Sequence, residues 1–297
     1  MISDIMKEYG FTHSYVKALK AGSASMVDLP IETYATLSGF ALRTVVHKDL
    51  CPSAMSVFDW ELLSKAAEDI GFETKVITRL WDEDHLELEK RTEAHKMIIE
   101  STNPVITWDA SVPEWEIITT FDSVNNSYTG ISVKGDPINL PIDKLGRREI
   151  PVLFVMELTS WIKPTNIIEK ILQIIINHNE GSEAIATPDY LEGYQAYDHW
   201  IEKMKTITED DWDSRYYFET YAIMKKHASK YFQVLLTDNS NLKKMSQCFD
   251  DLANLFGQLL DQRKTSSYPN NKNEIIRNLK KAKELEYQIY IEAKNLS

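Results

Sequence analysis

Apolar and polar positions follow two different periods along this chain, and both periods occur in its first 160 residues. Alternating or continuous apolar runs predict strands, whereas apolar positions three and four residues apart predict helices. Strands are predicted at 72–78, 104–108 and 151–158, with a two-stranded hairpin within 108–137. Helices are predicted at 11–22, 30–41, 58–70 and 82–100. The first half therefore mixes helices with strands.

Beyond Pro164 the pattern is helical almost throughout. Helices are predicted at 167–177, 188–205, 213–236, 241–263 and 274–295. The sequence thus predicts an α+β domain at residues 1–160, followed by an all-helical domain at residues 161–297. The joining run 151–162 has no flexible Gly/Ser linker, and large aromatic residues recur between 190 and 221. We expect the two halves to pack as one cooperative unit, with the first domain or a second copy covering these rings.

The hairpin within 108–137 is the most informative segment of the chain. Its apolar and aromatic residues suit a pleated sheet; they are Ile117, Ile118, Phe121, Tyr128, Ile131 and Val133. The run Val124–Ser127 contains two asparagines, which tolerate a positive φ, so it predicts the turn. A Gly-Asp-Pro sequence ends the segment at Pro137.

Composition and charge narrow the classes of partner. The net charge of −12 falls mainly on residues 1–160, which carry 15 Lys/Arg against 25 Asp/Glu. An acidic surface disfavours nucleic acid and anionic membranes, and it favours a cationic ligand such as an amine. No apolar run of 18 residues predicts a membrane span, and the first residues do not resemble a signal peptide. The two cysteines, Cys51 and Cys248, belong to no CxxC pair, which suits a cytoplasmic protein.

The hairpin resembles papain-like cysteine hydrolases of the bacteriocin-processing peptidase type. In that family a His opens the first strand, an acidic residue follows its apolar run, and an Asp-Pro pair closes the second strand. Asp122, Asp136 and Pro137 match this arrangement, whereas Glu116 stands where the His is expected. The resemblance implies the fold of an acyl-transfer enzyme whose general base has been replaced.

Three further segments are similar to the butirosin biosynthesis protein H-like family; they are 34–55, 113–122 and 191–204. That family joins a papain-like acyltransferase domain to a helical region, and its named member moves an acyl group from a carrier protein to an aminoglycoside amine. The family places its nucleophilic Cys at the start of the first central helix. His13 or Ser14 stands near that place here, so the resemblance implies degenerate catalytic residues.

Candidate site residues follow from this resemblance and from the chemistry of the side chains. Ser14 is one candidate nucleophile, and Cys51, with His47 four residues away, is the other. We expect Glu116 and Asp136 to lie near each other at one cleft, across from residues 13–14. Carboxylates and indoles around that cleft suit an amine; the candidate ligand-binding residues are His13, Ser14, Arg43, Trp108, Glu114, Trp115, Glu116, Asp122 and Asp136.

The sequence predicts no metal site and no cofactor. The histidines have no acidic partners at ligand spacing, and no glycine-rich nucleotide loop is present. Three functions stay open. The leading one is a non-catalytic relative of papain-like acyltransferases that binds a small amine or an acyl- or peptide-like ligand. The alternatives are an active acyltransferase or amidase that uses Cys51 or Ser14, and a protein-interaction scaffold in a biosynthetic assembly that contacts a carrier protein.

Overall fold

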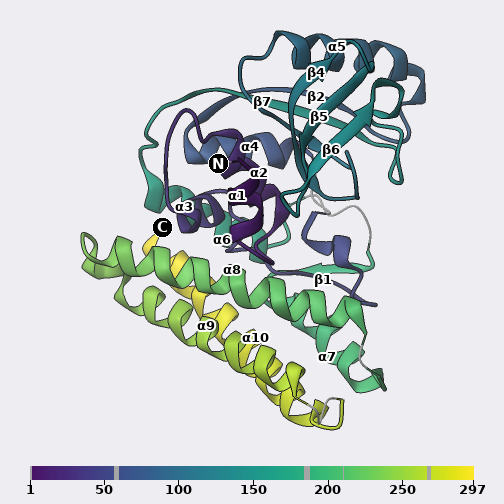
Figure 1. The fold of residues 1–297 in the computed structure, drawn as a ribbon. Coiled ribbons are helices and arrows are strands. Elements are labelled where there is room, and N and C mark those ends of the chain that lie inside the picture. The colour runs from purple at the N-terminus through teal and green to yellow at the C-terminus, as the bar shows by residue number, and fades with distance from the viewer. Residues whose placement is uncertain (1, 57–59, 184–187, 210, 266–268) are drawn as a thin grey trace. The chain divides into compact units, whose positions relative to one another are not determined.

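The chain forms two compact units in the computed structural model, which describes residues 2–56, 60–183, 188–209, 211–265 and 269–297 (Figure 1). The first unit comprises residues 1–34 and 64–164, and the second comprises residues 35–63 and 165–297. A single division near residue 160 was the expectation; the contacts instead group residues 35–63 with the C-terminal helices. The expected α+β class is confirmed to the extent of an antiparallel sheet and a C-terminal helical region.

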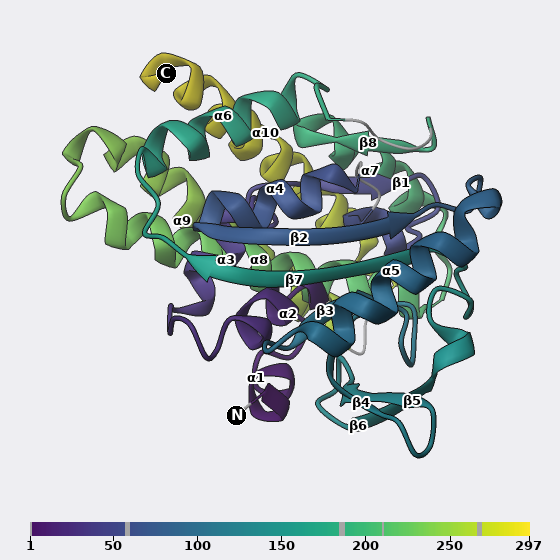
Figure 2. The same ribbon diagram turned by 90° about the horizontal axis from the view of Figure 1, so that it is seen from above.

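A six-stranded antiparallel sheet is the centre of the first unit. Its order is β2 (Phe72–Arg79), β7 (Leu153–Trp161), β3 (Val105–Trp108), β4 (Trp115–Asp122), β5 (Ser127–Ile131) and β6 (Pro137–Pro141). The long strands β2 and β7 run side by side (Figure 2). The hairpin turn lies where the asparagines predicted it, and Asn126 adopts a φ of +52°.

Helices cover both faces of this sheet. On one face, α2 (Ser14–Gly22) brings Gly22 against Ile106 and Leu158. On the other face, α5 (Glu87–Glu100) buries Ala94 and Ile98 against a cluster that includes Ile118. Three more helices contain residues of the first unit: α1 (Ile2–Glu8), α3 (Ile31–Leu37) and α4 (Glu61–Ile70). Because side chains alternate along a strand, Trp115 and Ile117 of β4 lie on the α2 face, whereas Glu116 and Ile118 lie on the α5 face.

The second unit is mainly helical. Its long helices are α6 (Ile167–Asn179), α7 (Ala196–Thr206), α8 (Trp212–Leu236), α9 (Lys243–Lys264) and α10 (Lys272–Leu296). It also contains a two-stranded sheet of β1 (Val45–His47) and β8 (Tyr190–Glu192). The sequence predicts helix across residues 190–192, and that prediction is wrong: a 3-10 helix begins at Gly193, and the α-helix begins at Ala196.

Tyrosines of α8 attach β1 to this unit. The Tyr221 hydroxyl donates to the Val45 carbonyl at 2.7 Å and accepts from the Val45 N–H at 2.8 Å. The Tyr217 hydroxyl donates to the Cys51 carbonyl and accepts from the His47 N–H. These contacts satisfy backbone groups of a strand that has one short partner strand, β8.

Most of the large rings between 190 and 221 pack within the second unit. Trp200 and Tyr221 are buried, and both lie against Phe256 of α9, with ring centroids 5.9 and 6.1 Å apart. The first domain or a second copy is therefore not needed to cover them. Trp212 is the exposed exception and stacks on Tyr216.

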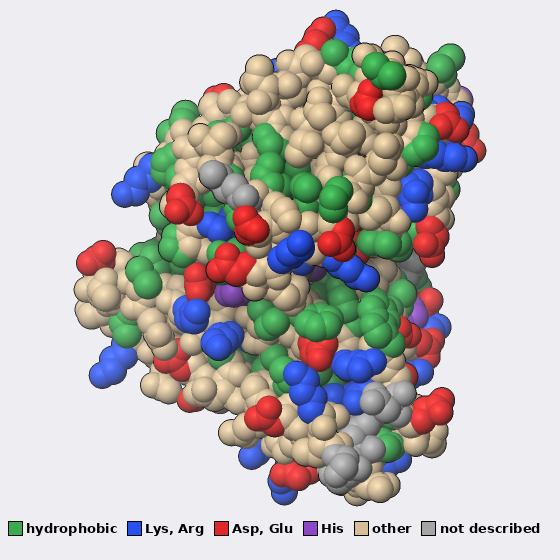
Figure 3. Space-filling view, viewed as in Figure 1, with side chains coloured by type: hydrophobic (Ala, Val, Ile, Leu, Met, Phe, Trp, Pro, Cys, Tyr) green, Lys and Arg blue, Asp and Glu red, His purple; other side chains and the backbone are tan. Residues whose placement is uncertain are grey.

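The hydropathy of the helices and the charge of the surface concern possible membrane and nucleic-acid partners. Among the described helices, none combines the length and apolar character that a membrane crossing requires. On the face drawn in Figure 3, acidic and basic side chains are intermixed and no broad basic patch is visible.

Candidate functional site

The start of α2 meets the start of β4 through Ser14. The Ser14 hydroxyl donates a hydrogen bond to the Glu114 carboxylate and accepts one from the Trp115 N–H at 3.3 Å. The preceding residue, His13, caps the helix, and its Nδ1 accepts from the Tyr15 N–H. The Tyr15 and Trp115 rings pack edge to face at 5.1 Å. The carboxylate beside the start of α2 is therefore that of Glu114.

Glu116 lies on the opposite face of the sheet from α2. It pairs with Thr107 and is two residues from Ile118, whose side chain packs with α5. Its buried carboxylate accepts from the Ser111 N–H and hydroxyl, both at 2.5 Å, and from the Val133 N–H at 3.2 Å. Burial raises the pKa of Glu116. Glu116 thus connects the loop that contains Ser111 with the turn that contains Val133. It does not face residues 13–14.

The other acidic candidates have partners other than Glu116. The Asp136 carboxylate is 66% exposed and pairs with Lys7 at 4.0 Å. The Asp122 carboxylate caps the hairpin turn by accepting from the Val124 and Asn125 N–H groups. These bonds, and one from the Asn125 side chain, lower the pKa of Asp122. Asp122 therefore has a structural role in the turn, and Asp136 has an exposed ion pair.

The two candidate indoles are packed in the interior. Trp108 and Trp115 are both buried, and their ring centroids are 5.0 Å apart. Trp115 also packs edge to face on Phe154 of β7. Neither ring is placed to stack on a ligand from solvent, so an amine near Glu114 would be held by charge pairing rather than by these rings.

Lys17 is a site residue that the sequence did not single out. It follows Ser14 by one helical turn, and its buried ammonium donates to the carbonyls of Met6 and Gly10 at 3.2 Å and Val133 at 3.0 Å. Burial lowers the pKa of Lys17 to about 8, and the charge of Glu114 opposes that change. All three ammonium protons are engaged, so Lys17 ties the α1–α2 turn to the β5–β6 turn. Its spacing from Ser14 was the available sequence signal.

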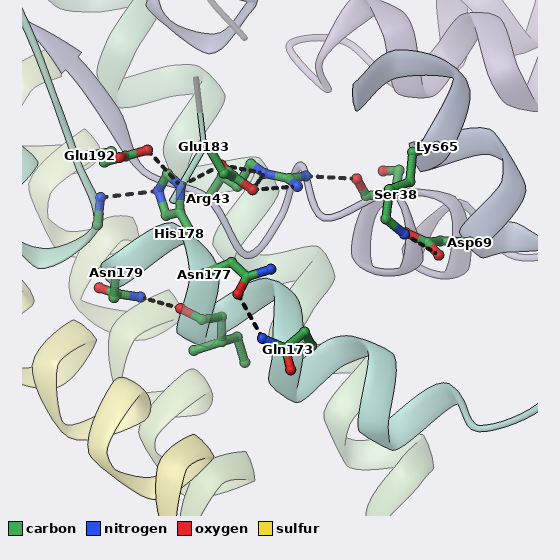
Figure 4. Close-up of polar contacts among 12 residues, drawn as sticks. Ser38, Arg43, Lys65, Asp69, Gln173, Asn177, His178, Asn179, Glu183 and Glu192 are labelled. Carbon is green, nitrogen blue, oxygen red and sulfur yellow. Dashed lines mark hydrogen bonds and ion pairs between the residues drawn. The ribbon is translucent and has the colours of Figure 1, made fainter. Parts of the chain in front are cut away.

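A second cluster of charged side chains lies inside the second unit (Figure 4). Arg43 forms a buried ion pair with Glu183, in which Arg43 Nε and Nη2 lie 2.8 and 2.7 Å from Glu183 Oε1. Arg43 therefore joins this cluster and not the Glu114 site. The Arg43 charge and the His178 hydrogen bond hold the pKa of Glu183 at about 2 despite its burial. Gly39, at a φ of +82°, makes room for this pair, because an added Cβ would lie 2.0 Å from Arg43 Nη1.

Buried His178 connects the carboxylates of this cluster to the backbone. Its Nε2 accepts from the Thr44 N–H at 2.9 Å and the Gly193 N–H at 3.0 Å. Nε2 also lies 3.0 Å from the Thr44 carbonyl, and Nδ1 lies 2.8 Å from the Glu183 carboxylate. Glu192 approaches Nδ1 at 3.5 Å. His178 thus lies between two carboxylates and the backbone of Thr44 and Gly193.

This cluster also brings together three groups of metal-ligand type. His178 Nδ1 and carboxylate oxygens of Glu183 and Glu192 lie within 4.8 Å of one another. His178 Nδ1 and the Glu183 carboxylate already contact each other at 2.8 Å, and Arg43 binds the same carboxylate. A metal ion here would have to replace both contacts.

Cys51 contacts hydroxyl groups in the second unit. Its half-buried thiol lies 3.0 Å from the Ser53 hydroxyl, which lies 3.1 Å from the Tyr190 hydroxyl. Nδ1 of His47 accepts from the Asp49 N–H, and the His47 ring packs on Tyr190 at 4.7 Å. Tyr190 thus contacts the His47 ring and, through Ser53, the Cys51 thiol. No hydrogen bond joins the Cys51 thiol to the His47 imidazole in the described part of the chain.

No protein-family model matches this chain, and no curated protein matches it. A functional assignment therefore rests on two sets of contacts, those of Ser14 and Glu114 in the first unit and those of the Arg43–Glu183–His178 cluster in the second.

Proposed function

We propose that this protein is a non-catalytic relative of papain-like acyltransferases and binds a small amine through Glu114. The observation that carries the proposal is the contact between the Ser14 hydroxyl and the Glu114 carboxylate. Ser14 opens the helix that lies on the antiparallel sheet, and Glu114 directly precedes strand β4. The family resemblance gives the nucleophile's place to His13 or Ser14 and the base's place to Glu116, whereas the carboxylate that contacts Ser14 is that of Glu114.

The contacts of Ser14 argue against acyl transfer. Its side chain belongs to a residue only 4% exposed, and its oxygen both donates to Glu114 and accepts from Trp115. A carboxylate is a weak base for an alcohol. The nitrogen bases nearby are committed, since Lys17 holds three carbonyls and His13 Nδ1 accepts from Tyr15. No group among the described residues is in place to take the Ser14 proton efficiently.

The charge of the site favours an amine. Glu114 is half-buried and its carboxylate accepts the Ser14 hydrogen bond, so a ligand ammonium near it would gain a charge-assisted hydrogen bond. The net charge of −12 adds a long-range attraction for cations. A primary amine or the amino terminus of a short peptide has the required chemistry.

A thermal-shift screen with primary amines, short peptides and the matching N-acetylated compounds tests this proposal. A ligand at about 100 times its Kd stabilises the folded state by about 2.7 kcal/mol, which raises the Tm by several degrees. We expect amines to raise the Tm of the wild type and not that of Glu114→Gln. Asp136→Asn is the matched control, because that carboxylate is exposed on the same unit. Equal shifts in all three proteins, or equal shifts with acetylated compounds, would contradict the proposal.

An active serine acyltransferase is the second candidate, and one observation favours it. The Ser14 hydroxyl stands at a helix N-terminus and donates to a carboxylate, as an activated nucleophile does. A fluorophosphonate probe followed by intact mass measurement separates the two candidates. A single adduct on the wild type that is missing from Ser14→Ala would establish the enzyme. An unmodified wild type, beside a trypsin control that reacts, would support the binding protein.

A further inference from the structure

The three-residue strand β8 connects two polar sites of the second unit. At its end, Glu192 faces the buried cluster of His178 and Glu183. At its start, Tyr190 contacts the Ser53 hydroxyl, which contacts the Cys51 thiol. Between these ends, β8 pairs with β1 through only three residue pairs. A displacement of one end of so short a strand is therefore transmitted to the other.

The Glu192 carboxyl lacks a compensating charge of its own. Its Oε2 is buried and has no hydrogen-bond partner among the described residues, and it lies 3.5 Å from His178 Nδ1. Nδ1 of His178 lies closer to Glu183, at 2.8 Å, and Arg43 is also bound to Glu183. An ionised Glu192 would thus add a second buried negative charge beside Glu183. Burial and the Glu183 charge raise the pKa of Glu192 to about 7, although His178 and Arg43 oppose the change.

The surroundings of Glu192 contain few other groups that titrate. The charged and titratable side chains on the described elements packed around β8 are Arg43 ahead of β1, His178 of α6, Glu183 after α6, His47 of β1, the Lys48–Asp189 pair and His199 of α7. His199 binds the Val46 carbonyl, and the Lys48–Asp189 pair lies at the Tyr190 end of β8. Among the described residues, the charges that act on Glu192 are those of His178, Glu183 and Arg43.

We propose that the protonation state of Glu192 controls whether β8 lies on β1, and thereby whether Tyr190 stays in contact with the Ser53–Cys51 pair. With Glu192 neutral, the carboxyl remains beside His178 and the strand pairing holds. With Glu192 ionised, the carboxylate moves to water, and the path is short because the side chain is already 14% exposed. The backbone of β8 follows, and the Tyr190 hydroxyl leaves Ser53.

The alkylation rate of Cys51 measures this switch. The full-length protein is treated with iodoacetamide between pH 5.5 and 8.5, and Cys51 is quantified by peptide mapping. Each rate is divided by that of N-acetylcysteine at the same pH, which removes the ordinary ionisation of a thiol. We expect the normalised wild-type rate to rise at least threefold between pH 6 and pH 8. In Glu192→Gln, which keeps the shape and cannot ionise, the normalised rate should stay at the low value.

Two further observations keep the result decisive. Glu209→Gln, at an exposed carboxylate in the same unit, should reproduce the wild-type profile. Hydrogen–deuterium exchange of a peptide spanning 188–195, corrected for the intrinsic pH dependence of exchange, should show faster uptake at pH 8 than at pH 6 only when Glu192 is present. Parallel pH profiles in wild type and Glu192→Gln by both measurements would overturn the proposal.

Discussion

The positions of individual side chains decide which of two neighbouring carboxylates contacts Ser14. Glu114 and Glu116 are two residues apart, yet Glu114 meets Ser14 while Glu116 holds Ser111 and Val133. The alternation of β4 is readable from the sequence, but the point at which the strand begins is not. The loop closed by the Asp109 N–H and the Glu114 carbonyl sets that point. The sequence therefore assigned to Glu116 a contact with the start of α2 that Glu114 makes.

The pairing of Arg43 with Glu183 also could not be predicted from the sequence. The two residues are 140 positions apart in the chain, and neither lies in a recognisable motif. Gly39 is the one local sign, because its positive φ and the missing Cβ admit the guanidinium. Nothing in the sequence distinguishes this glycine from one that merely ends a helix.

Substitution of Gly39 tests how tightly this pair is packed. Gly39→Ala should lower the free energy of unfolding by about 2–4 kcal/mol, since it forces a strained φ and displaces a buried ion pair. Gly257→Ala is the matched control, because nothing lies within 4 Å of its added Cβ and the site is within α9. There alanine should stabilise by about 0.5–1 kcal/mol. Urea unfolding of both variants gives the comparison, and equal effects would contradict the close packing at Gly39.

Secondary structure elements were predictable where they are long and periodic. The helix predicted at 213–236 is observed at Trp212–Leu236, and the one predicted at 274–295 at Lys272–Leu296. The short strands β1 and β8 were missed. A strand of three residues is too short to show a hydrophobic periodicity. Its stability comes from tertiary contacts such as those of Tyr221.

Removal of the Tyr221 hydroxyl tests that dependence. Tyr221→Phe leaves both backbone groups of Val45 without this partner in a buried place, so we expect a loss of about 2–4 kcal/mol in the free energy of unfolding. Tyr287→Phe on α10 should change stability by less than about 0.5 kcal/mol, because that side chain is exposed. Urea titration monitored by circular dichroism measures both. A Tyr221→Phe protein as stable as the control would show that water replaces the hydroxyl.

The division of the molecule into units follows contacts and not chain order. Residues 35–63 belong with the C-terminal helices although they lie within the first half of the sequence. Composition and charge carried no sign of this, because the assignment depends on tyrosines 170 or more positions away. The fold class was readable from the sequence, whereas the boundary of the units was not.

A truncated chain tests this division. A fragment of residues 1–163 keeps β1 but loses β8, α6 and the tyrosines of α8, which together bind it. We expect this fragment to bind a hydrophobic dye and to melt without a sharp calorimetric transition. Intact protein under the same conditions is the reference. If the fragment melts in a cooperative transition close to that of the whole chain, residues 35–63 do not depend on residues 165–297 for their folding.

The interleaved chain order also has a consequence for biosynthesis. The ribosome releases β1 long before it has made the helix whose tyrosines bind it. At about 5–20 residues per second, the roughly 170 intervening residues take on the order of ten to thirty seconds. During that interval Val45 and Val46, buried in the finished protein, have no native partners. The nascent chain therefore exposes an unpaired apolar strand, which makes a cotranslational chaperone more useful to this protein than to one whose units follow each other in sequence.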